Sequence, residues 1–301
     1  MHPGSRFLLT AIMLPGLALT LATAAAAQNW QWQSPLPQGN TLSAVDFVDA
    51  DHGWAVSNYG VTLRTTDGGT TWALHATDTR YSLSGVYFLD AQRGWAVGAM
   101  GMIYHTTDGG RHWTPQSSGT SAQLLDVTFV DADRGWIAGD GGWILGTTDG
   151  GLNWIEQPSG MTGALFDICF VDTQMGWAAG DGGTILHTTD GGGSWVPQSS
   201  GTTDWIESLA FVDAQTGWAA GLAGTLLHTT DGGTTWNAQE SGMSPIIYCL
   251  SFVDEQTGWA VGDQGMIRKT TDGGASWTPQ TSGASGRLYG VKFVDAVHGS
   301  V

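Results

Sequence analysis

Short apolar stretches alternate with glycine-rich polar turns along the whole chain, and residues 165–198 show the pattern most clearly. Residues 165–171 (LFDICFV) are rich in strand-forming side chains and are followed by Asp172, which predicts a first strand. Further strands are predicted at 176–180, 184–188 and 194–198, with a tight turn at 181–183. Pro197 suits an outer edge strand, because proline cannot donate a ladder hydrogen bond. The segment therefore predicts an antiparallel meander of four strands.

This unit is repeated along the chain at a constant spacing. A T-T-D-G-G segment followed by tryptophan recurs every 41 residues, as from Asp67 to Asp108, and a strand-ending phenylalanine and a Gly-Trp pair keep the same step. Glycines after the aspartate allow the positive backbone angles of a tight turn, and the carboxylate can accept hydrogen bonds from its own loop. We expect these aspartates to be structural; they are Asp67, Asp108, Asp149, Asp190, Asp231 and Asp272.

A period near 41 residues lies in the range of four-stranded propeller blades. Six units are complete, and residues 287–295 begin a seventh, whereas residues 30–34 resemble an isolated outer strand. We therefore predict an all-β, seven-bladed β-propeller of four-stranded antiparallel blades, with an incomplete seventh blade to which both termini contribute. The chain stops at Val301, where Gly-Trp is expected, which favours truncation of a longer product. The alternative is a six-bladed ring with both ends as appendages.

Residues 1–27 have the features of a secretory signal peptide, with Arg6 before a short apolar core and alanines at the expected cleavage site. Residues 28–301 are then a single propeller domain. We expect an exported protein, periplasmic or extracellular, that does not span a membrane. Only two cysteines occur, Cys169 and Cys249, and their separation by two units predicts two buried free thiols rather than a disulfide.

The formal charge of −17, or −18 once Arg6 is removed, argues against binding to nucleic acid. No metal site is expected, because His105, His187 and His228 share one offset of the repeat and are better explained as recurring strand positions. The glycine-rich turns lack the following helix that would bind phosphate, so no cofactor is expected either.

The repeated motifs resemble a known family. The T-T-D-G-G-x-T-W string matches the Asp-box, or bacterial neuraminidase repeat, and the full unit is similar to the photosystem II stability and assembly factor family and its bacterial relatives. The resemblance covers residues 30–301 and implies a seven-bladed, non-enzymatic scaffold for binding or assembly. That family is described as carrying an arginine-rich patch, whereas the nine lysines and arginines left after removal of Arg6 from the ten are scattered here.

Two functions follow as hypotheses. In the first, a monomeric scaffold binds a protein partner of unknown identity through the loops before strand one and between strands two and three, where the units differ. Met100, Asp181 and Asp263 are among these variable positions, and the residues predicted to bind the partner are Tyr59, Tyr81, Trp143, Trp205, Tyr248 and Arg287.

The second hypothesis is a glycoside hydrolase, sialidase-like, or a carbohydrate-binding propeller. Arg93 and Arg134 stand at the same position of the repeat, on the side of the Asp-boxes. They therefore do not come together on the opposite face, where catalysis would take place. Asp140 and Asp181 recur at a hairpin position that Asp263 also occupies, which favours turn chemistry over catalysis. We therefore predict that the protein is not an enzyme and has no catalytic residues.

Overall fold

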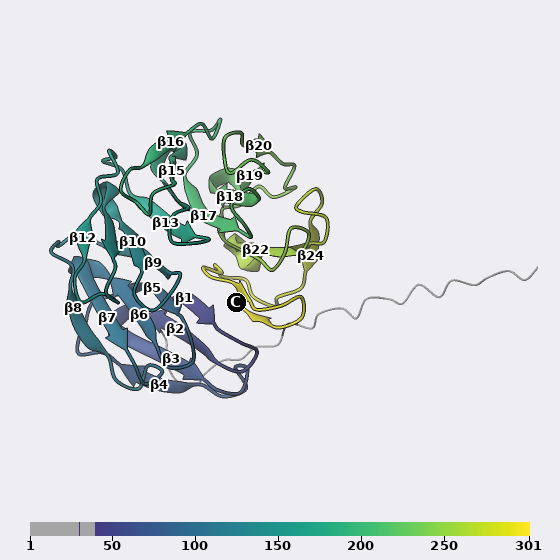
Figure 1. The fold of residues 1–301 in the computed structure, drawn as a ribbon. Coiled ribbons are helices and arrows are strands. Elements are labelled where there is room, and N and C mark those ends of the chain that lie inside the picture. Colours follow the sequence, from purple (N-terminus) through teal and green to yellow (C-terminus); the bar gives the residue numbers. More distant parts are fainter. Residues whose placement is uncertain (1–29, 31–39) are drawn as a thin grey trace, which may run out of the picture.

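The computed structural model describes Trp30 and residues 40–301, so the predicted signal peptide and all of the predicted N-terminal outer strand except Trp30 lie outside the described residues. The described residues form six four-stranded antiparallel sheets and one two-stranded sheet. These sheets follow one another around a central axis in chain order, from purple to yellow (Figure 1). Among the described residues, no helix has both the length and the apolar character needed to span a bilayer.

Each complete blade contains four consecutive strands paired in chain order, so the predicted meander is confirmed. Blades 1 to 3 comprise β1 (Leu42–Phe47), β2 (Gly53–Ser57), β3 (Val61–Thr65), β4 (Ala73–Ala76), β5 (Leu83–Phe88), β6 (Gly94–Gly98), β7 (Met102–Thr106), β8 (Thr114–Ser117), β9 (Leu124–Phe129), β10 (Gly135–Gly139), β11 (Ile144–Thr147) and β12 (Ile155–Glu156). Blades 4 to 6 comprise β13 (Leu165–Phe170), β14 (Gly176–Gly180), β15 (Ile185–Thr188), β16 (Val196–Gln198), β17 (Ile206–Phe211), β18 (Gly217–Gly221), β19 (Leu226–Thr229), β20 (Asn237–Ala238), β21 (Ile247–Phe252), β22 (Gly258–Gly262), β23 (Ile267–Thr270) and β24 (Thr278–Gln280).

A short 3-10 turn joins the second and third strands of every complete blade. These turns are η1 (Asn58–Gly60), η2 (Ala99–Gly101), η3 (Asp140–Gly142), η4 (Asp181–Gly183), η5 (Leu222–Gly224) and η6 (Asp263–Gly265). In each, the middle residue and the glycine after it have positive φ angles. The turn therefore imposes the same backbone shape on every blade, whichever side chain stands at its middle position.

Aromatic side chains hold neighbouring blades together, as the repeat predicted. The indole of Trp177 on β14 stacks on the Phe211 ring of the next blade, with centroids 3.6 Å apart. Its Nε1 also donates a 3.1 Å hydrogen bond to the carbonyl of Gly232, in the Asp-box of that next blade. Trp236, the box tryptophan, meets the Phe211 ring edge-on at 5.9 Å. Both recurring tryptophans therefore converge on one phenylalanine, and the same arrangement is repeated around the ring.

The glycine of each Gly-Trp pair is required by this packing. A Cβ atom at Gly176 would lie 2.5 Å from ring carbons of Phe170 on the neighbouring strand, closer than real Cβ contacts come. The ring can lie flat against the backbone only where no side chain intervenes. This explains why glycine precedes the tryptophan at the start of the second strand in every blade.

The prediction of seven blades is corrected by the structure, which has six blades and a small extra sheet. That sheet pairs β25 (Lys292–Phe293) with β26 (Gly299–Ser300), two residues in each strand. The second strand was expected to be missing, but Gly299 begins it in the usual register opposite Phe293. Ser300 stands where the other second strands have tryptophan, so this sheet lacks the indole that braces a full blade.

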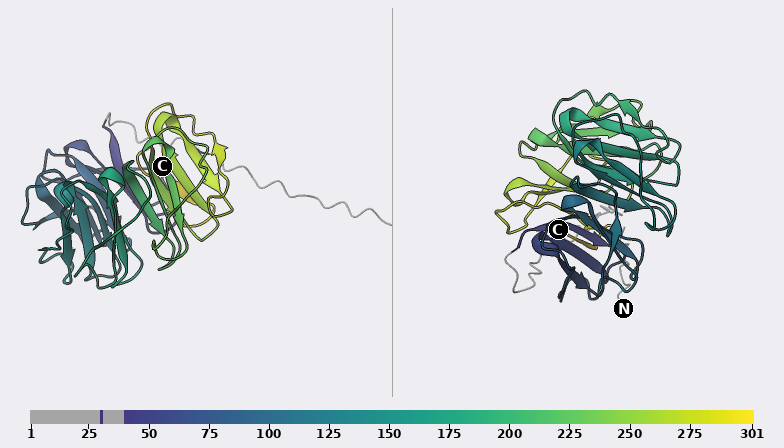
Figure 2. Two further views of the ribbon diagram at one scale, coloured as in Figure 1. Left: turned by 90° about the horizontal axis from the view of Figure 1, so that it is seen from above. Right: turned by 90° about the vertical axis from the view of Figure 1, so that its left-hand side faces the viewer.

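The small sheet nevertheless joins the two ends of the described chain. Its strand β25 lies beside both β21 and β1, and the yellow C-terminal strands adjoin the purple strands of blade 1 in each view (Figure 2). Lys292 Nζ lies 3.1 Å from Asp46 Oδ1 on β1. Trp30 meets the Phe293 ring edge-on, with centroids 5.8 Å apart. Trp30 therefore makes the contact that the box tryptophan makes in the complete blades.

Candidate functional site

The two ends of the blades form chemically different faces. On one, here called the loop face, the turn between strands two and three is bonded to the loop entering strand one, as in the 2.9 Å bond from Asp181 N to the carbonyl of Ala164. On the other, the box face, the Asp-box is bonded to the turn between strands one and two, as from Gly191 N to the carbonyl of Gln174 at 2.9 Å. The two faces are therefore built from different turns.

The box carboxylates are used within their own turns. Asp190 Oδ1 accepts hydrogen bonds from Thr188 Oγ1 at 2.8 Å and from Ser194 N at 2.9 Å, and Oδ2 accepts one from Ser194 Oγ at 2.8 Å. The hydroxyl of Ser194 and its backbone amide hold the pKa of Asp190 below its ordinary value. Equivalent bonds are made by Asp67, Asp108, Asp149, Asp231 and Asp272. These groups stabilise turns and do not gather around a common centre.

Four non-glycine residues occupy strained positions on the loop face, and two of them carry large apolar side chains. Tyr59 (φ 63°) and Met100 (φ 60°) are the middle residues of η1 and η2, where blades 3 and 4 have Gly141 and Gly182, and blades 5 and 6 have Ala223 and Gln264. A left-handed conformation costs a non-glycine residue about 1–2 kcal/mol. The two side chains recover little of this cost by burial, because Tyr59 is 66 % exposed and Met100 is 56 % exposed. Strain at exposed side chains is a reason to look for a functional role.

One loop connects these two turns. Thr77 N donates a 2.9 Å hydrogen bond to the carbonyl of Gly60 in η1, and Ala99 N in η2 donates a 3.0 Å bond to the carbonyl of Ser82. Tyr81 lies in this loop and is 52 % exposed. Tyr59, Tyr81 and Met100 therefore project from one hydrogen-bonded set of loops. We call these three residues the blade 1–2 patch.

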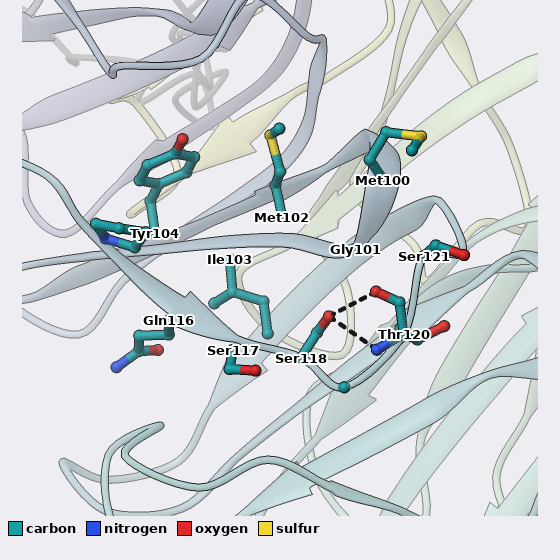
Figure 3. A pocket seen from close by; sticks show the side chains of 12 residues that line it. Met100, Gly101, Met102, Ile103, Tyr104, Gln116, Ser117, Ser118, Thr120 and Ser121 are labelled. Atoms are coloured by element: carbon teal, nitrogen blue, oxygen red, sulfur yellow. Dashed lines mark hydrogen bonds between the residues drawn. The ribbon is translucent and has the colours of Figure 1, made fainter.

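A hollow of about 480 Å³ adjoins the patch on blade 2, and Met100, Met102 and Tyr104 line one side of it (Figure 3). On the opposite wall the Ser118 hydroxyl bonds to the carbonyl and amide of Thr120, which fixes the loop after β8. The Tyr104 hydroxyl donates a 2.6 Å bond to Asp78 Oδ1. Burial together with this carboxylate raises the pKa of Tyr104 to about 12, so the hydroxyl remains a neutral donor. The walls of the hollow are thus both apolar and polar.

Two of the predicted partner-binding residues, Tyr248 and Arg287, meet in a second cluster. Arg287 Nε lies 3.1 Å from Asp263 Oδ1 in η6, and the Tyr248 hydroxyl lies 3.3 Å from the same oxygen. The Tyr248 and Tyr289 rings are 5.0 Å apart. These side chains therefore make their polar and ring contacts with one another, at the junction of blade 6 with the small sheet.

The remaining two predicted residues lie apart from both clusters. Trp205 is 48 % exposed and contacts Phe166, with ring centroids 5.7 Å apart. Trp143, by contrast, is half-buried and packs against the core cluster that contains Leu124. The structure therefore gives Trp143 a packing role. It was selected in the sequence because it departs from the repeat, and not because of any signal of burial.

The innermost strands carry half-buried acidic side chains that the sequence analysis did not single out. Asp126 on β9 accepts a 3.2 Å hydrogen bond from Ile168 N of the next blade, and Asp167 on β13 accepts one of 2.7 Å from Leu209 N. Burial, reinforced by the Asp167 carboxylate, raises the pKa of Asp126 well above its ordinary value. Burial also raises the pKa of Asp167. Both aspartates stand at the same position of the first strand in consecutive repeats, and this recurrence is the signal by which the sequence could have revealed them.

The described residues contain no group of three or more His, Cys, Asp or Glu side chains that could hold a metal ion. Cys169 and Cys249 are free thiols, as predicted, although both are half-buried rather than fully buried. His105 and His187 stack on the indoles of their own blades, at 4.8 Å in each case. Their recurrence is therefore a packing feature of the third strand.

The repeated box turns and the ring of four-stranded sheets define an Asp-box β-propeller. The chain belongs to the family described as photosynthesis system II assembly factor YCF48, whose model matches residues 22–118, 112–196 and 158–241. This family was expected from the repeated motif. Among curated protein sequences no significant match was found.

Solved structures are similar to this chain in fold. YCF48 from Cyanidioschyzon merolae aligns with a TM-score of 0.72 and 24 % identity, over 88 % of this chain and 95 % of that one. A structure described as YCF48 bound to D1 peptide gives 0.74 and 22 %, over 88 % and 91 %. The GH74 xyloglucanase from Xanthomonas campestris gives 0.63 and 15 %, over 78 % of this chain and 46 % of that chain. At these identities the likeness supports the fold alone.

Proposed function

We propose that this protein is an exported, non-enzymatic scaffold that binds a protein partner through the blade 1–2 patch. The observation that carries the proposal is the strain at Tyr59 and Met100, whose exposed side chains stand where two other blades have glycine. Exposed aromatic and methionine side chains are typical of interface anchors. Ala223 and Gln264 share the left-handed backbone, so the choice of Tyr59 and Met100 rests on their large, exposed apolar side chains.

The comparisons support an assembly role. The family description names a photosynthesis system II assembly factor, and one similar structure is YCF48 with a bound D1 peptide. A partner that contributes a peptide segment fits the hollow beside Met100, which offers apolar methionines and polar groups side by side. We infer that the partner belongs to an assembling complex, and that the propeller acts as a monomer in the periplasm or outside the cell.

The hydrogen bonds of the loop-face carboxylates favour a non-enzymatic role over glycosidase activity. Glycoside hydrolysis commonly uses two carboxyl groups free to act on the substrate, about 5–10 Å apart. Asp181 Oδ2 accepts a 2.9 Å bond from Ala164 N, and Asp263 pairs with Arg287. Both side chains thus hold loops in place.

A double substitution, Tyr59→Gly with Met100→Gly, tests the surface. It removes both side chains while allowing the backbone its present shape, so the fold is retained. The processed protein and the variant would be used to capture partners from an extract of the native host, with quantification of each captured protein. Leu152→Ser, which alters an 82 % exposed side chain on the box face, is the matched control.

We expect at least one captured partner to be lost with the double variant and retained with Leu152→Ser. Retention of every partner by the double variant would refute the blade 1–2 patch as the binding surface.

A further inference from the structure

The third strand of most blades places a nitrogen-bearing side chain opposite the indole of its own Gly-Trp pair, and burial lowers the pKa values of the three histidines among them. Cross-strand pairing places Trp95 opposite His105, Trp177 opposite His187 and Trp218 opposite His228, with stacked rings 4.8, 4.8 and 4.9 Å apart. Blade 6 uses Lys269, whose Nζ lies 4.6 Å from the centroid of the Trp259 ring. Arg64 is paired with Trp54 in blade 1. Five of the six blades thus supply a nitrogen-bearing side chain here.

Blade 3 departs from this rule. Its tryptophan, Trp136, is paired with Gly146, which has no side chain to place on the indole. The other face of Trp136 is stacked on Phe170 at 3.5 Å, as in the other blades. Trp136 is 3 % exposed, against 0 or 1 % for the other five indoles. The indole thus remains covered, and the flexible Gln157 side chain lies beside Gly146, with Nε2 2.5 Å from the position that a Cβ atom of residue 146 would take.

A hollow of about 620 Å³ opens at this position on the box face, between blades 3 and 4. Trp136, Gly146, Trp154 and Gln157 contribute to its lining, as do the box aspartates of both blades. Gln157 Oε1 and Trp195 Nε1 are both buried without a hydrogen-bond partner among the described residues, and at the same two positions of the repeat Trp154 Nε1 donates a 3.2 Å bond to Gln116 Oε1. Gln157 therefore belongs to the packing of the repeat, and the hollow itself combines aromatic surface with the box carboxylates.

The charges around the hollow favour a cation. Asn153 and Ser194 donate hydrogen bonds that lower the pKa values of Asp149 and Asp190 below the ordinary range, so both carboxylates are ionised at neutral pH. Arg134 also lines the hollow and contributes one positive charge. The two carboxylates outnumber it, and the chain as a whole carries a formal charge of −17.

We propose that this hollow is a binding site for a basic side chain of a protein partner, with arginine the best fit. A guanidinium group is planar, stacks on indole and donates hydrogen bonds in its plane. With the Gln157 side chain moved aside, it stacks over Trp136 in the place that a histidine, lysine or arginine of the chain itself fills in the other blades. The box carboxylates Asp149 and Asp190, although bonded within their own turns, supply negative charge at the wall of the hollow. The site lies on the face opposite the blade 1–2 patch and does not depend on it.

The test exchanges residues between blades. Gly146→His restores the rule of the repeat in blade 3, and His187→Gly breaks it in blade 4. A Cβ at position 146 would lie 2.5 Å from Gln157 Nε2, the end of a flexible side chain. Blades 2 and 4 accommodate His105 with Gln116 and His187 with Gln198 at the same offsets, so the histidine is compatible with the fold.

The probe is N-acetyl-L-argininamide, and the matched neutral control is the corresponding citrulline derivative. Binding is followed through the indole N–H signals of protein labelled with nitrogen-15 at tryptophan, with Trp136→Phe used to assign the signal. We expect a saturable shift of the Trp136 signal with the arginine probe, an affinity about tenfold weaker in Gly146→His, and a new saturable shift at Trp177 in His187→Gly.

Three results would overturn the proposal. They are an absence of saturable shift in the natural protein, an equal shift with the citrulline derivative, or an unchanged affinity in Gly146→His. If Gly146→His does not fold, the gain of binding in His187→Gly decides the question, and no gain there counts against the proposal. The Tyr59→Gly, Met100→Gly double variant is expected to bind the arginine probe normally.

Discussion

Single residues in this repeat are informative mainly where they depart from their counterparts in other blades. Trp143 and Tyr59 both stood out in the sequence, yet the first is half-buried and the second is 66 % exposed. What separates them is position relative to the turn. Tyr59 is the middle residue of η1 and is held outward, whereas Trp143 follows the glycine of η3 and turns back onto the core. Side-chain direction after a turn is not visible in a one-dimensional pattern.

The backbone strain at Tyr59 predicts an unusual effect of glycine. Tyr59→Gly is expected to be more stable than Tyr59→Ala by about 1 kcal/mol, because alanine retains the left-handed strain and glycine does not. Urea unfolding of the two variants provides the measurement, and Tyr59→Ala serves as the matched control for loss of the ring. Equal unfolding free energies in the two variants would show that the turn is not strained.

The half-buried pair Asp126 and Asp167 predicts a dependence of stability on pH. Their pKa values are raised in the folded state, so their contribution to stability is fully present below the unfolded value of about 4 and is lost as pH rises through the raised value. Asp126→Asn keeps an acceptor for Ile168 N and cannot ionise. The variant is expected to show a smaller decline, because only Asp167 can still ionise, and to be at least as stable as the natural protein at neutral pH.

Urea unfolding between about pH 4 and pH 8 measures this effect, with the exposed Asp140→Asn as control. An Asp126→Asn variant that keeps the slope of the natural protein contradicts the assignment of the titration to this pair.

At the scale of the element, the sequence pattern defined the strands of a blade almost to the residue. In blade 4 the second strand and its turn were predicted at 176–180 and 181–183, and these are the bounds of β14 and η4. The outer strand was predicted at 194–198 and is β16, Val196–Gln198, with Pro197 on the edge as expected. Glycine, proline and strand-forming side chains act locally, which is why the strands could be predicted without the fold.

The sequence predicted that tryptophans pack between blades, but it did not predict the geometry of these contacts. Recurring tryptophans indicated packing, but the convergence of two indoles on one ring, such as Phe211, depends on the angle between sheets. The side chain paired with five of the six indoles was likewise seen only as a recurring histidine. The hollow at Gly146 follows from that stacking, so the sequence alone gave no reason to examine it.

This packing predicts the cost of removing one inner tryptophan. Trp177 is fully buried, stacked between His187 and Phe211, and bonded to the next blade, so Trp177→Ala is expected to lower the unfolding free energy by about 3–5 kcal/mol. Trp205→Ala, at a 48 % exposed position, is the control and is expected to cost less than about 1 kcal/mol. Chemical denaturation that gives similar losses for the two variants would contradict the bracing role.

At the scale of the whole molecule, the termini were expected to share the last blade. The structure has a two-stranded sheet there, and Lys292 and Asp46 join that sheet to blade 1. Asp46 is 4 % exposed, and a buried carboxylate requires a partner. The lysine appeared in the sequence as one of several scattered basic residues. Its pairing across the junction of first and last blades could not be recognised until the ring was closed in space.

The contact between Trp30 and Phe293 predicts that the N-terminal side helps to hold this junction. In the complete blades a box tryptophan covers the strand-ending phenylalanine edge-on, as Trp236 covers Phe211 at 5.9 Å, and Trp30 covers Phe293 at 5.8 Å. Trp30→Ala should therefore loosen β25, which lies far from it in sequence, and its neighbour β1. The loss in unfolding free energy is expected to be about 1–3 kcal/mol, because Trp30 is only half-buried.

Amide hydrogen exchange separates this local effect from a general loss of stability. In Trp30→Ala the amides of β25 and β1 are expected to exchange faster, while those of β13 and β14, across the ring, keep their protection. Trp205→Ala, which removes a tryptophan far from the junction, should leave β25 unchanged. Because β25 meets β1 through the Lys292–Asp46 pair as well, the exchange rates at β1 should rise less than those at β25. Unchanged protection at β25 in Trp30→Ala would mean that the ring is held closed from the C-terminal side alone.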